Sequence, residues 1–372
     1  MKIAQEKLSP IITADITSEI LLLVSTNKGG FIYYSDEKRK NWEVSGPYLL
    51  GSIVHHMVLD NRDNKTILMA AQTKEHGSCI FKSIDFGMNW VPTKFPTKLK
   101  NGTEINHIFR LAPGHVNEPN IWYSGTSPQG LFRSDDFGDT WYEVESISNI
   151  IQNYNVDQNQ LEYKYEKLHS IFVDVENMDC ITVCMTNGGA YRSTDHGNSW
   201  IEINGSNKVE SYMMVQHEND NNTLYQQNKL GIYKYIANKN DWENIGCDID
   251  VGDCGFALAL HPKDKKTIWS FPMEGTDIWS RVCTGGQPAV YCTKDGGESW
   301  FRQDVGFPIW HAWFTVMSKG LTADALDDCG LYLGTTCGSI WFSDNEGNSW
   351  RQIVAHLPKV YSIETGYINK DA

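Results

Sequence analysis

The chain has no long hydrophobic run and carries little positive charge. The apolar run ILLLV at residues 20–24 is far too short to cross a bilayer. Lysines and arginines number 32 against 46 aspartates and glutamates, and the net charge of −14 argues against nucleic acid or an anionic membrane as a partner. The N-terminal segment MKIAQEKLSP lacks the apolar stretch of a secretory signal, so a cytoplasmic location is predicted.

Several site signatures are also missing. The nine cysteines are scattered, odd in number and without a Cys-x-x-Cys pair, so we expect small buried side chains in a reducing compartment. There is no Gly-rich phosphate loop and no Gly-x-Ser-x-Gly elbow. A nucleotide cofactor is therefore not expected.

One eight-residue pattern, Ser/Thr-x-Asp-x-Gly-x-x-Trp, occurs five times. The copies are SIDFGMNW (83–90), SDDFGDTW (134–141), STDHGNSW (193–200), TKDGGESW (293–300) and SDNEGNSW (343–350). The Asp or Asn side chain can bond backbone N–H groups and fold a turn, and Gly supplies the positive φ that such a turn needs. Trp is a large apolar anchor. The pattern predicts a corner between two strands, used repeatedly.

Two degenerate copies, SDEKRKNW (35–42) and YIANKNDW (235–242), bring the number of repeats to seven. The anchors are spaced 42 to 59 residues apart, at Trp42, Trp90, Trp141, Trp200, Trp242, Trp300 and Trp350. Short strands in a repeat of this length predict an all-β fold, a single seven-bladed β-propeller over residues 1–372. The C-terminal run KVYSIETGYI (359–368) follows the last anchor and is expected to close the ring by joining the N-terminal strands in one blade.

The five turns resemble the bacterial neuraminidase repeat, or Asp-box, and the chain resembles the BNR/Asp-box propellers, often labelled sialidase-like. That resemblance implies the fold but several activities, because the group includes sialidases, other glycoside hydrolases, sorting receptors and photosystem assembly factors. A sialidase would need an arginine triad. Of eight arginines, most lie at the repeated turns and only Arg110 and Arg281 remain, so true sialidase activity is not expected.

Long connections fall on one expected face. With strands counted outward from the axis, the repeated turns join the third strand to the fourth. Residues 142–167, 271–288 and 303–312 lie in connections of the opposite kind, which project from the other face. Long connections in a compact domain are often functional. We expect a pocket around the axis on this loop-rich face, for a small-molecule substrate or a protein partner.

Histidines recur at the start of the innermost strands. Aligning these strands places His55, His107 and His169 in one column, which Tyr212 and Phe256 continue. Convergent imidazoles suit a transition metal such as Zn, Fe or Cu. The alternative is that these side chains simply pack between blades.

The sequence favours a cytosolic small-molecule enzyme with a metal held by the three histidines, with an oxidoreductase as one candidate. Candidates for the catalytic pocket wall are Arg281, Glu274, Lys229 and Trp310. One alternative is a non-enzymatic assembly or binding propeller that uses the same face. Another is a glycoside hydrolase with two carboxylates, drawn from Glu274, Asp277, Glu210 and Asp253.

Overall fold

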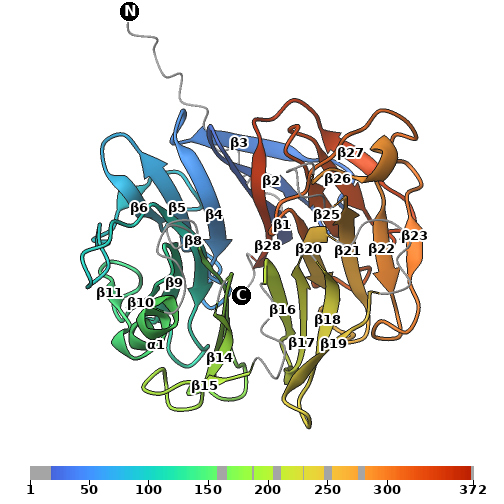
Figure 1. Cartoon of the computed structure of the whole chain (residues 1–372). Coiled ribbons are helices and arrows are strands. Elements are labelled where there is room, and N and C mark those ends of the chain that lie inside the picture. The colour runs from blue at the N-terminus through green and yellow to red at the C-terminus, as the bar shows by residue number, and fades with distance from the viewer. Residues whose placement is uncertain are drawn as a thin grey trace, which may run out of the picture.

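The computed structural model describes residues 18–156, 166–186, 188–203, 211–228, 230–246, 254–274 and 281–369. These residues form seven four-stranded antiparallel sheets arranged as a ring, seen in Figure 1 with the inner strands toward the centre. The predicted seven-bladed propeller is therefore confirmed. Among the described residues, no helix has the length and apolar character that crossing a membrane requires.

Six of the blades run outward from the axis in chain order. The second to fourth blades are β4 (Ile53–Leu59), β5 (Ile67–Thr73), β6 (Gly77–Ser83) and β7 (Val91–Pro92); β8 (His107–Pro113), β9 (Trp122–Ser127), β10 (Leu131–Ser134) and β11 (Tyr142–Glu143); and β12 (Leu168–Val173), β13 (Ile181–Met185), β14 (Gly189–Ser193) and β15 (Ile201–Glu202). One helix, α1 (Glu145–Val156), follows β11.

The remaining blades repeat the pattern. They are β16 (Met213–His217), β17 (Asp220–Asn228), β18 (Gly231–Ile236) and β19 (Asp241–Asn244); β20 (Cys254–Leu260), β21 (Ile268–Met273), β22 (Val290–Thr293) and β23 (Phe301–Gln303), with a short 3-10 turn η2 (Thr284–Gly286); and β24 (Leu321–Ala323), β25 (Leu331–Gly334), β26 (Ile340–Ser343) and β27 (Arg351–Val354).

The first blade combines both parts of the chain. Its sheet has the order β28 (Val360–Asn369), β1 (Ser18–Thr26), β2 (Gly29–Ser35) and β3 (Glu43–Tyr48). The innermost strand β28 pairs with β1 from Ser18 opposite Asn369 to Thr26 opposite Val360. The expected closure by the run 359–368 is thus observed.

The repeated turns all share one hydrogen-bond geometry. In each, the Ser or Thr hydroxyl accepts the N–H of the Gly four residues on, as at Ser83 and Gly87 (2.8 Å). The Asp or Asn side chain likewise accepts the N–H four residues on, as at Asp85 and Asn89 (2.9 Å). Two successive residues have positive φ, Phe86 (57°) and Gly87 (87°) in this copy.

The turn tryptophans join neighbouring blades. The indole N–H of Trp242 donates to the Ile203 carbonyl (3.0 Å), and that of Trp300 donates to the Ile245 carbonyl (2.8 Å). Both acceptors belong to the preceding blade. The hydrophobic core likewise lies between sheets, because clusters such as the one that contains Leu68 and Trp122 span two blades. Each anchor therefore stabilises a blade-to-blade interface.

A buried ion pair joins the first and last blades. Arg39, in the degenerate first turn, lies 2.7 Å from Asp324, and both side chains are almost fully buried. A second Arg39 nitrogen donates to the Asp328 carbonyl, and the Tyr332 hydroxyl donates to Asp324. Arg39 takes the place of the turn Gly in the sequence pattern, and here that side chain contributes to ring closure.

Candidate functional site

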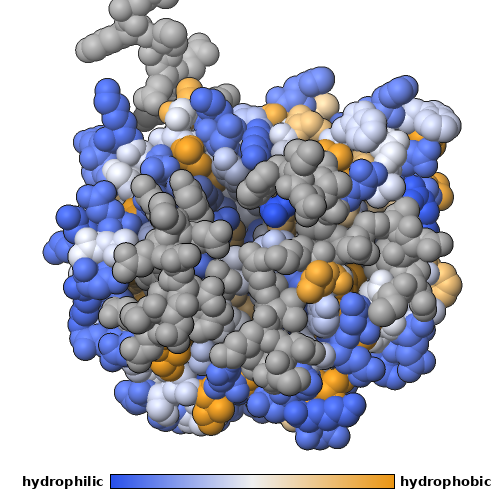
Figure 2. Space-filling model, in the orientation of Figure 1, coloured by the Kyte–Doolittle hydropathy of each residue, from blue (hydrophilic) through white to orange (hydrophobic). Residues whose placement is uncertain are grey.

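The two faces of the ring carry different connections. Each repeated turn joins a third strand to a fourth, as 83–90 joins β6 to β7, and the turns after the innermost strands lie on that same face, here called the turn face. The connections from a fourth strand to the next innermost strand lie on the other, the loop face. Figure 2 shows a described surface that is mostly hydrophilic, with separate small hydrophobic patches.

Two long connections of the loop face are joined into one wall. The Cys283 N–H donates to the Phe314 carbonyl (2.8 Å), and the Ala312 N–H donates to the Gly286 carbonyl (3.0 Å). The Thr315 hydroxyl donates to the Arg281 carbonyl (2.9 Å). The connection after β21 and the connection after β23 thus form a continuous structure, which we call the loop wall.

The loop wall presents exposed aromatic rings beside a carboxylate. Trp310 is 65% exposed and Trp313 55% exposed. Trp313 packs over Gly286, where an added Cβ would lie 3.1 Å from the indole. The neighbouring Gly285 N–H donates to Glu274 (3.3 Å). The predicted wall residues Glu274, Arg281 and Trp310 therefore belong to one structure, whereas Lys229, Asp277, Glu210 and Asp253 lie outside the described residues.

A repeated β-bulge places one residue of five innermost strands in equivalent positions. In each of these blades, the pairing register between the innermost strand and the second strand shifts once. At the shift, one residue of the innermost strand has no partner in the second strand. These residues, which we call the aromatic collar, are Tyr361, His55, Phe109, His169 and Phe256. Bulges re-aim side chains and are frequent beside functional sites.

The bulges correct the predicted histidine column. His55 and His169 occupy equivalent positions, but the third blade places Phe109 there, two residues beyond His107. His107 instead contacts His55 from the next blade, with ring centres 4.6 Å apart, and Tyr361 stacks on the other side of His55 at 5.6 Å. The sequence alignment missed this offset between His107 and the other two histidines, because the sequence of one strand does not show where a bulge lies.

Three cations lie over the collar rings. Lys167 Nζ lies 4.7 Å from the centre of the Phe109 ring, and Lys359 Nζ lies 5.3 Å from the centre of the Tyr361 ring. The Arg281 guanidinium lies 4.8 Å from Phe256. Ammonium and guanidinium groups are attracted to aromatic faces. A basic side chain therefore lies over three of the five collar rings.

Deeper in the ring, three inner strands and the segment before β24 share a charged cluster. Glu364 Oε1 lies 2.5 Å from Arg110, 2.9 Å from His56 and 3.6 Å from Lys319. Although burial opposes ionisation, the Lys319 and Arg110 charges hold the pKa of Glu364 well below its usual range. Burial and Arg110 lower the pKa of Lys319 to about 7. Glu364 is therefore an ionised structural carboxylate and not a general acid.

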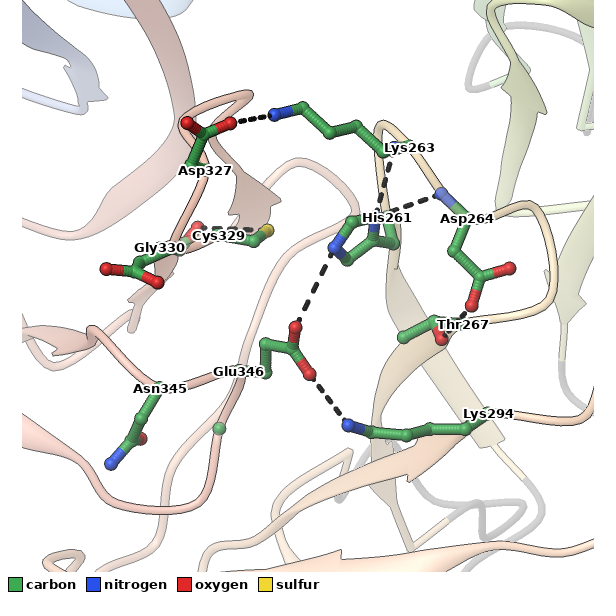
Figure 3. Close-up of polar contacts among 12 residues, drawn as sticks. His261, Lys263, Asp264, Thr267, Lys294, Asp327, Cys329, Gly330, Asn345 and Glu346 are labelled. Atoms are coloured by element: carbon green, nitrogen blue, oxygen red, sulfur yellow. Dashed lines mark hydrogen bonds and ion pairs between the residues drawn. The ribbon is translucent and has the colours of Figure 1, made fainter.

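The turn face carries a polar cluster in which each labelled charged side chain of Figure 3 has a partner. Lys294 lies 2.7 Å from Glu346, and Lys263 lies 2.6 Å from Asp327. His261 Nδ1 accepts the Lys263 N–H (3.0 Å), and its other nitrogen faces Glu346 at 3.9 Å. These contacts link the last two blades, so the cluster serves as a structural reference in the experiments below.

A cavity of about 320 Å³ opens between the outer strands of the first and last blades, lined by Trp42, Arg351, Ile353 and their neighbours. None of its lining residues is in the collar or the loop wall. It therefore contributes nothing to the candidate site, which is the loop wall together with the collar.

No protein-family model matches the chain. The xyloglucanase Xgh74A of Acetivibrio thermocellus is 30% identical over 246 residues, which cover 59% of this chain and 28% of the relative. A xyloglucanase of Paenibacillus sp. is 24% identical over 249 residues, which cover 61% of this chain and 24% of the relative. The chain thus spans less than a third of the length of these relatives.

Solved structures show the same architecture. The GH74 xyloglucanase of Xanthomonas campestris superposes with a TM-score of 0.66 and 20% identity, covering 89% of this chain and 52% of that one. A GH74 enzyme of Niastella koreensis superposes with a TM-score of 0.62 and 18% identity, covering 88% of this chain and 51% of that one. YCF48 of Cyanidioschyzon merolae superposes with a TM-score of 0.57 and 12% identity, covering 84% of this chain and 89% of that one.

These similarities correct two expectations. The relatives are xyloglucanases, so the metal-dependent enzyme inferred from the histidines and the sialidase-like label are both wrong. Among the described residues, no three His, Cys, Asp or Glu side chains are grouped to hold a metal. The physical reason is visible at the collar, where Lys167 and Lys319 act on His169 and would repel a second cation. The chain is a seven-bladed β-propeller that resembles the GH74 xyloglucanases.

Proposed function

We propose that this propeller binds and hydrolyses a polysaccharide related to xyloglucan at the loop wall. The observation that carries the proposal is the exposed indole of Trp313, which lies over Gly286 next to the Gly285 N–H that bonds Glu274, with the exposed Trp310 three residues earlier in the same connection. Large exposed apolar groups mark binding sites. A flat indole offers an apolar face to a sugar ring, while nearby polar groups fix its orientation. The similarity to xyloglucanases supports this class of substrate.

Hydrolysis of a glycosidic bond needs two carboxyl groups in most families. Glu274 supplies one from the loop wall. Glu364 does not qualify, because Arg110 and His56 already engage it. The second would come from Asp277, Glu210 or Asp253. The five repeated turns support membership of the Asp-box propellers, a group that by resemblance includes glycoside hydrolases.

The test is release of reducing ends from xyloglucan by the purified chain. Glu274→Gln is expected to lower kcat by about 10²–10⁴-fold, because one of the two acid/base groups is lost. Trp310→Ala should mainly raise KM. The matched control Glu346→Gln, on the turn face, should leave both constants unchanged. Turnover that survives in Glu274→Gln would overturn the assigned role of Glu274.

A second candidate is a carbohydrate-binding propeller without hydrolytic activity. It is favoured by the exposed indoles of Trp310 and Trp313, because stacking on a sugar ring needs no acid/base group. Retention of the protein by xyloglucan, lost in Trp310→Ala but accompanied by no reducing ends, would replace the first proposal with this one. Neither retention nor hydrolysis would overturn both.

A further inference from the structure

Trp313 is held by its chain neighbours on both sides. The Ala312 N–H donates to the Gly286 carbonyl (3.0 Å), and the Phe314 carbonyl accepts the Cys283 N–H (2.8 Å). The Ala312 carbonyl accepts two further bonds, from the Phe314 N–H (2.9 Å) and from the Cys283 thiol (2.8 Å). These bonds form a tight turn around Trp313 and join it to the connection after β21. The backbone of Trp313 is therefore fixed by the fold itself.

The indole of Trp313 lies face-on against Gly286. A Cβ added to Gly286 would lie 3.1 Å from the indole Cε2, 3.3 Å from Cζ2 and 3.4 Å from Cδ2. Carbon atoms in contact are normally about 3.5–4.0 Å apart. Cε2 and Cδ2 form the bond that the two rings of the indole share, so a group close to all three atoms lies over the ring plane and not at its edge. Only a residue without a side chain leaves the indole in this place.

The backbone at Gly286 also favours glycine. Its φ is +66°, in the left-handed region that residues with a side chain rarely adopt. The preceding Gly285 has nearly the same φ, +61°, but an added Cβ there would meet no atom within 4 Å. Backbone strain is therefore common to both positions, whereas crowding against Trp313 is particular to Gly286.

The other side of the Trp313 indole is open. Trp313 is 55% exposed although Gly286 covers one face, so the exposed area lies on the opposite face and the ring edges. The indole of Trp310, which is 65% exposed, forms no hydrogen bond or ring contact with any residue that the structure describes. A group that is already held in its binding position loses less freedom when a ligand binds. Of the two exposed indoles, Trp313 is therefore the preorganised one.

We propose that Gly286 is a positioning residue, which presents Trp313 as a preformed, one-sided platform for a sugar ring of the polysaccharide. The inference rests on the proposed function, because it assigns the platform to that substrate. Stacking on a sugar needs an indole face that is free, and Gly286 supports the ring from behind. Gly286 directly follows Gly285, whose N–H donates to Glu274 (3.3 Å). One short segment thus sets the place of both the platform and the proposed catalytic carboxylate.

The position of the indole can be measured without sugar. The chain contains 13 tryptophans, so labelling with 5-fluorotryptophan gives a fluorine NMR spectrum in which Trp313→Phe identifies the Trp313 signal. Gly286→Ala is expected to shift this signal, because the new methyl group displaces the indole. The matched control is Gly77→Ala at the start of β6, where φ is +65° and an added Cβ would meet no atom within 4 Å. It should leave the Trp313 signal in place.

The native chain gives a second measurement, which holds even if Gly286→Ala fails to fold. Fluorine relaxation should show that the Trp313 indole moves with the whole protein, whereas the Trp310 indole, identified by Trp310→Phe, should show additional fast motion. Equal mobility of the two rings would overturn the preformed platform.

Sugar binding is measured by the retardation of the chain in a native gel that contains xyloglucan. Gly286→Ala and Trp313→Ala should each raise the apparent Kd about tenfold, because each removes the same stacking contact. The double variant should bind no more weakly than Trp313→Ala alone, since Gly286 acts only through that indole. A merely structural role of Gly286 would add a second loss to the first. Gly77→Ala and Glu346→Gln are the controls and should bind as the native chain does.

The outcomes separate this inference from the proposed function. Native retardation of Gly286→Ala, additive losses in the double variant, or an unshifted Trp313 signal would overturn the role of Gly286 and leave the proposed function standing. A native chain that xyloglucan does not retard would overturn the proposed function and, with it, the sugar assigned to the platform.

Discussion

At the scale of single residues, His56 shows how its neighbours decide a protonation state. It is fully buried on β4, and its Nδ1 accepts the Leu111 N–H (3.2 Å). The proton of the neutral ring is then on Nε2 and is donated to Glu364 (2.9 Å), so the Arg110 nitrogen 2.8 Å from Nε2 is a contact and not a hydrogen bond. A second proton on the ring would face the Leu111 N–H. Burial and Arg110 accordingly lower the pKa of His56 to about 4.

This low pKa of His56 predicts that the folded protein loses stability in acid. The folded-state pKa lies below the unfolded value of about 6.5, so below pH 6.5 the unfolded chain binds a proton that the folded chain refuses. Stability from His56 is complete above pH 6.5 and is lost toward pH 4, at about 1.4 kcal/mol per pH unit. Urea titrations between these pH values should show a flatter dependence for His56→Asn, whose amide oxygen can still accept the Leu111 N–H.

The matched control is His76→Asn, which alters an exposed histidine on the short turn between β5 and β6. Its pH dependence should follow that of the native chain. Equal slopes for native protein and His56→Asn would show that the ring takes up its proton in the folded state after all.

At the scale of elements, a second repeated device accompanies the turn motif. An Asp or His near the end of an innermost strand accepts the N–H two residues on, as Asp174 does from Glu176 (2.8 Å) and His217 does from Asn219 (3.2 Å). Asp60, His115, His261 and Asp324 act in the same way. Asp Oδ1 and His Nδ1 both lie within reach of the backbone N–H two residues on, so either residue type can form the same turn.

The anchor tryptophans give a test at this scale. Trp200 is half-buried, and its indole N–H donates to the Ser146 hydroxyl (3.0 Å) at the start of α1. Trp200→Ala should cost about 3 kcal/mol of unfolding free energy, because it removes a large aromatic group from a blade interface. Thermal denaturation measures the loss. Activity per folded molecule should persist, since the residue lies on the turn face.

The exposed Phe301→Ala offers a comparison, because its side chain is 60% exposed on an outer strand. Its melting temperature should stay close to that of the native protein. A fully folded Trp200→Ala that has lost activity would place function on the turn face.

At the scale of the whole molecule, the ring was predictable and its centre was not. Five intact turn motifs fix five blades, and Trp42 and Trp242 mark the two degenerate ones, because each copy specifies its own local geometry. The charged cluster around Glu364 joins residues from β4, β8, β28 and the segment before β24. Because these segments are far apart in the chain, no local sequence pattern predicts the cluster. The only sequence signal is a lone carboxylate in the otherwise uncharged run VYSIETGYI. The metal inference overlooked two cations: Lys167, two residues before His169, also lies near His55 and His107 of other blades, and Lys319 comes from the last blade.

Ring closure provides the corresponding prediction. Arg39→Ala should cost about 3–5 kcal/mol, because Asp324 would stay buried without its counter-charge. Denaturant titration measures the loss. The double variant Arg39→Met with Asp324→Leu removes both charges and should recover part of the stability. A single variant as stable as the native protein would show that the first and last blades are held by strand pairing alone.

The pairing of β28 with β1 also bears on synthesis. On the ribosome, β1 emerges roughly 330 residues before its inner partner, a delay of about 20–70 s at ~5–20 residues per second. During that interval the edge of β1 that will receive β28 is open to other strands. Six blades can form from contiguous chain as it appears, whereas the first must wait. A nascent chain of this protein is therefore expected to need chaperone protection at its first blade until β28 has emerged.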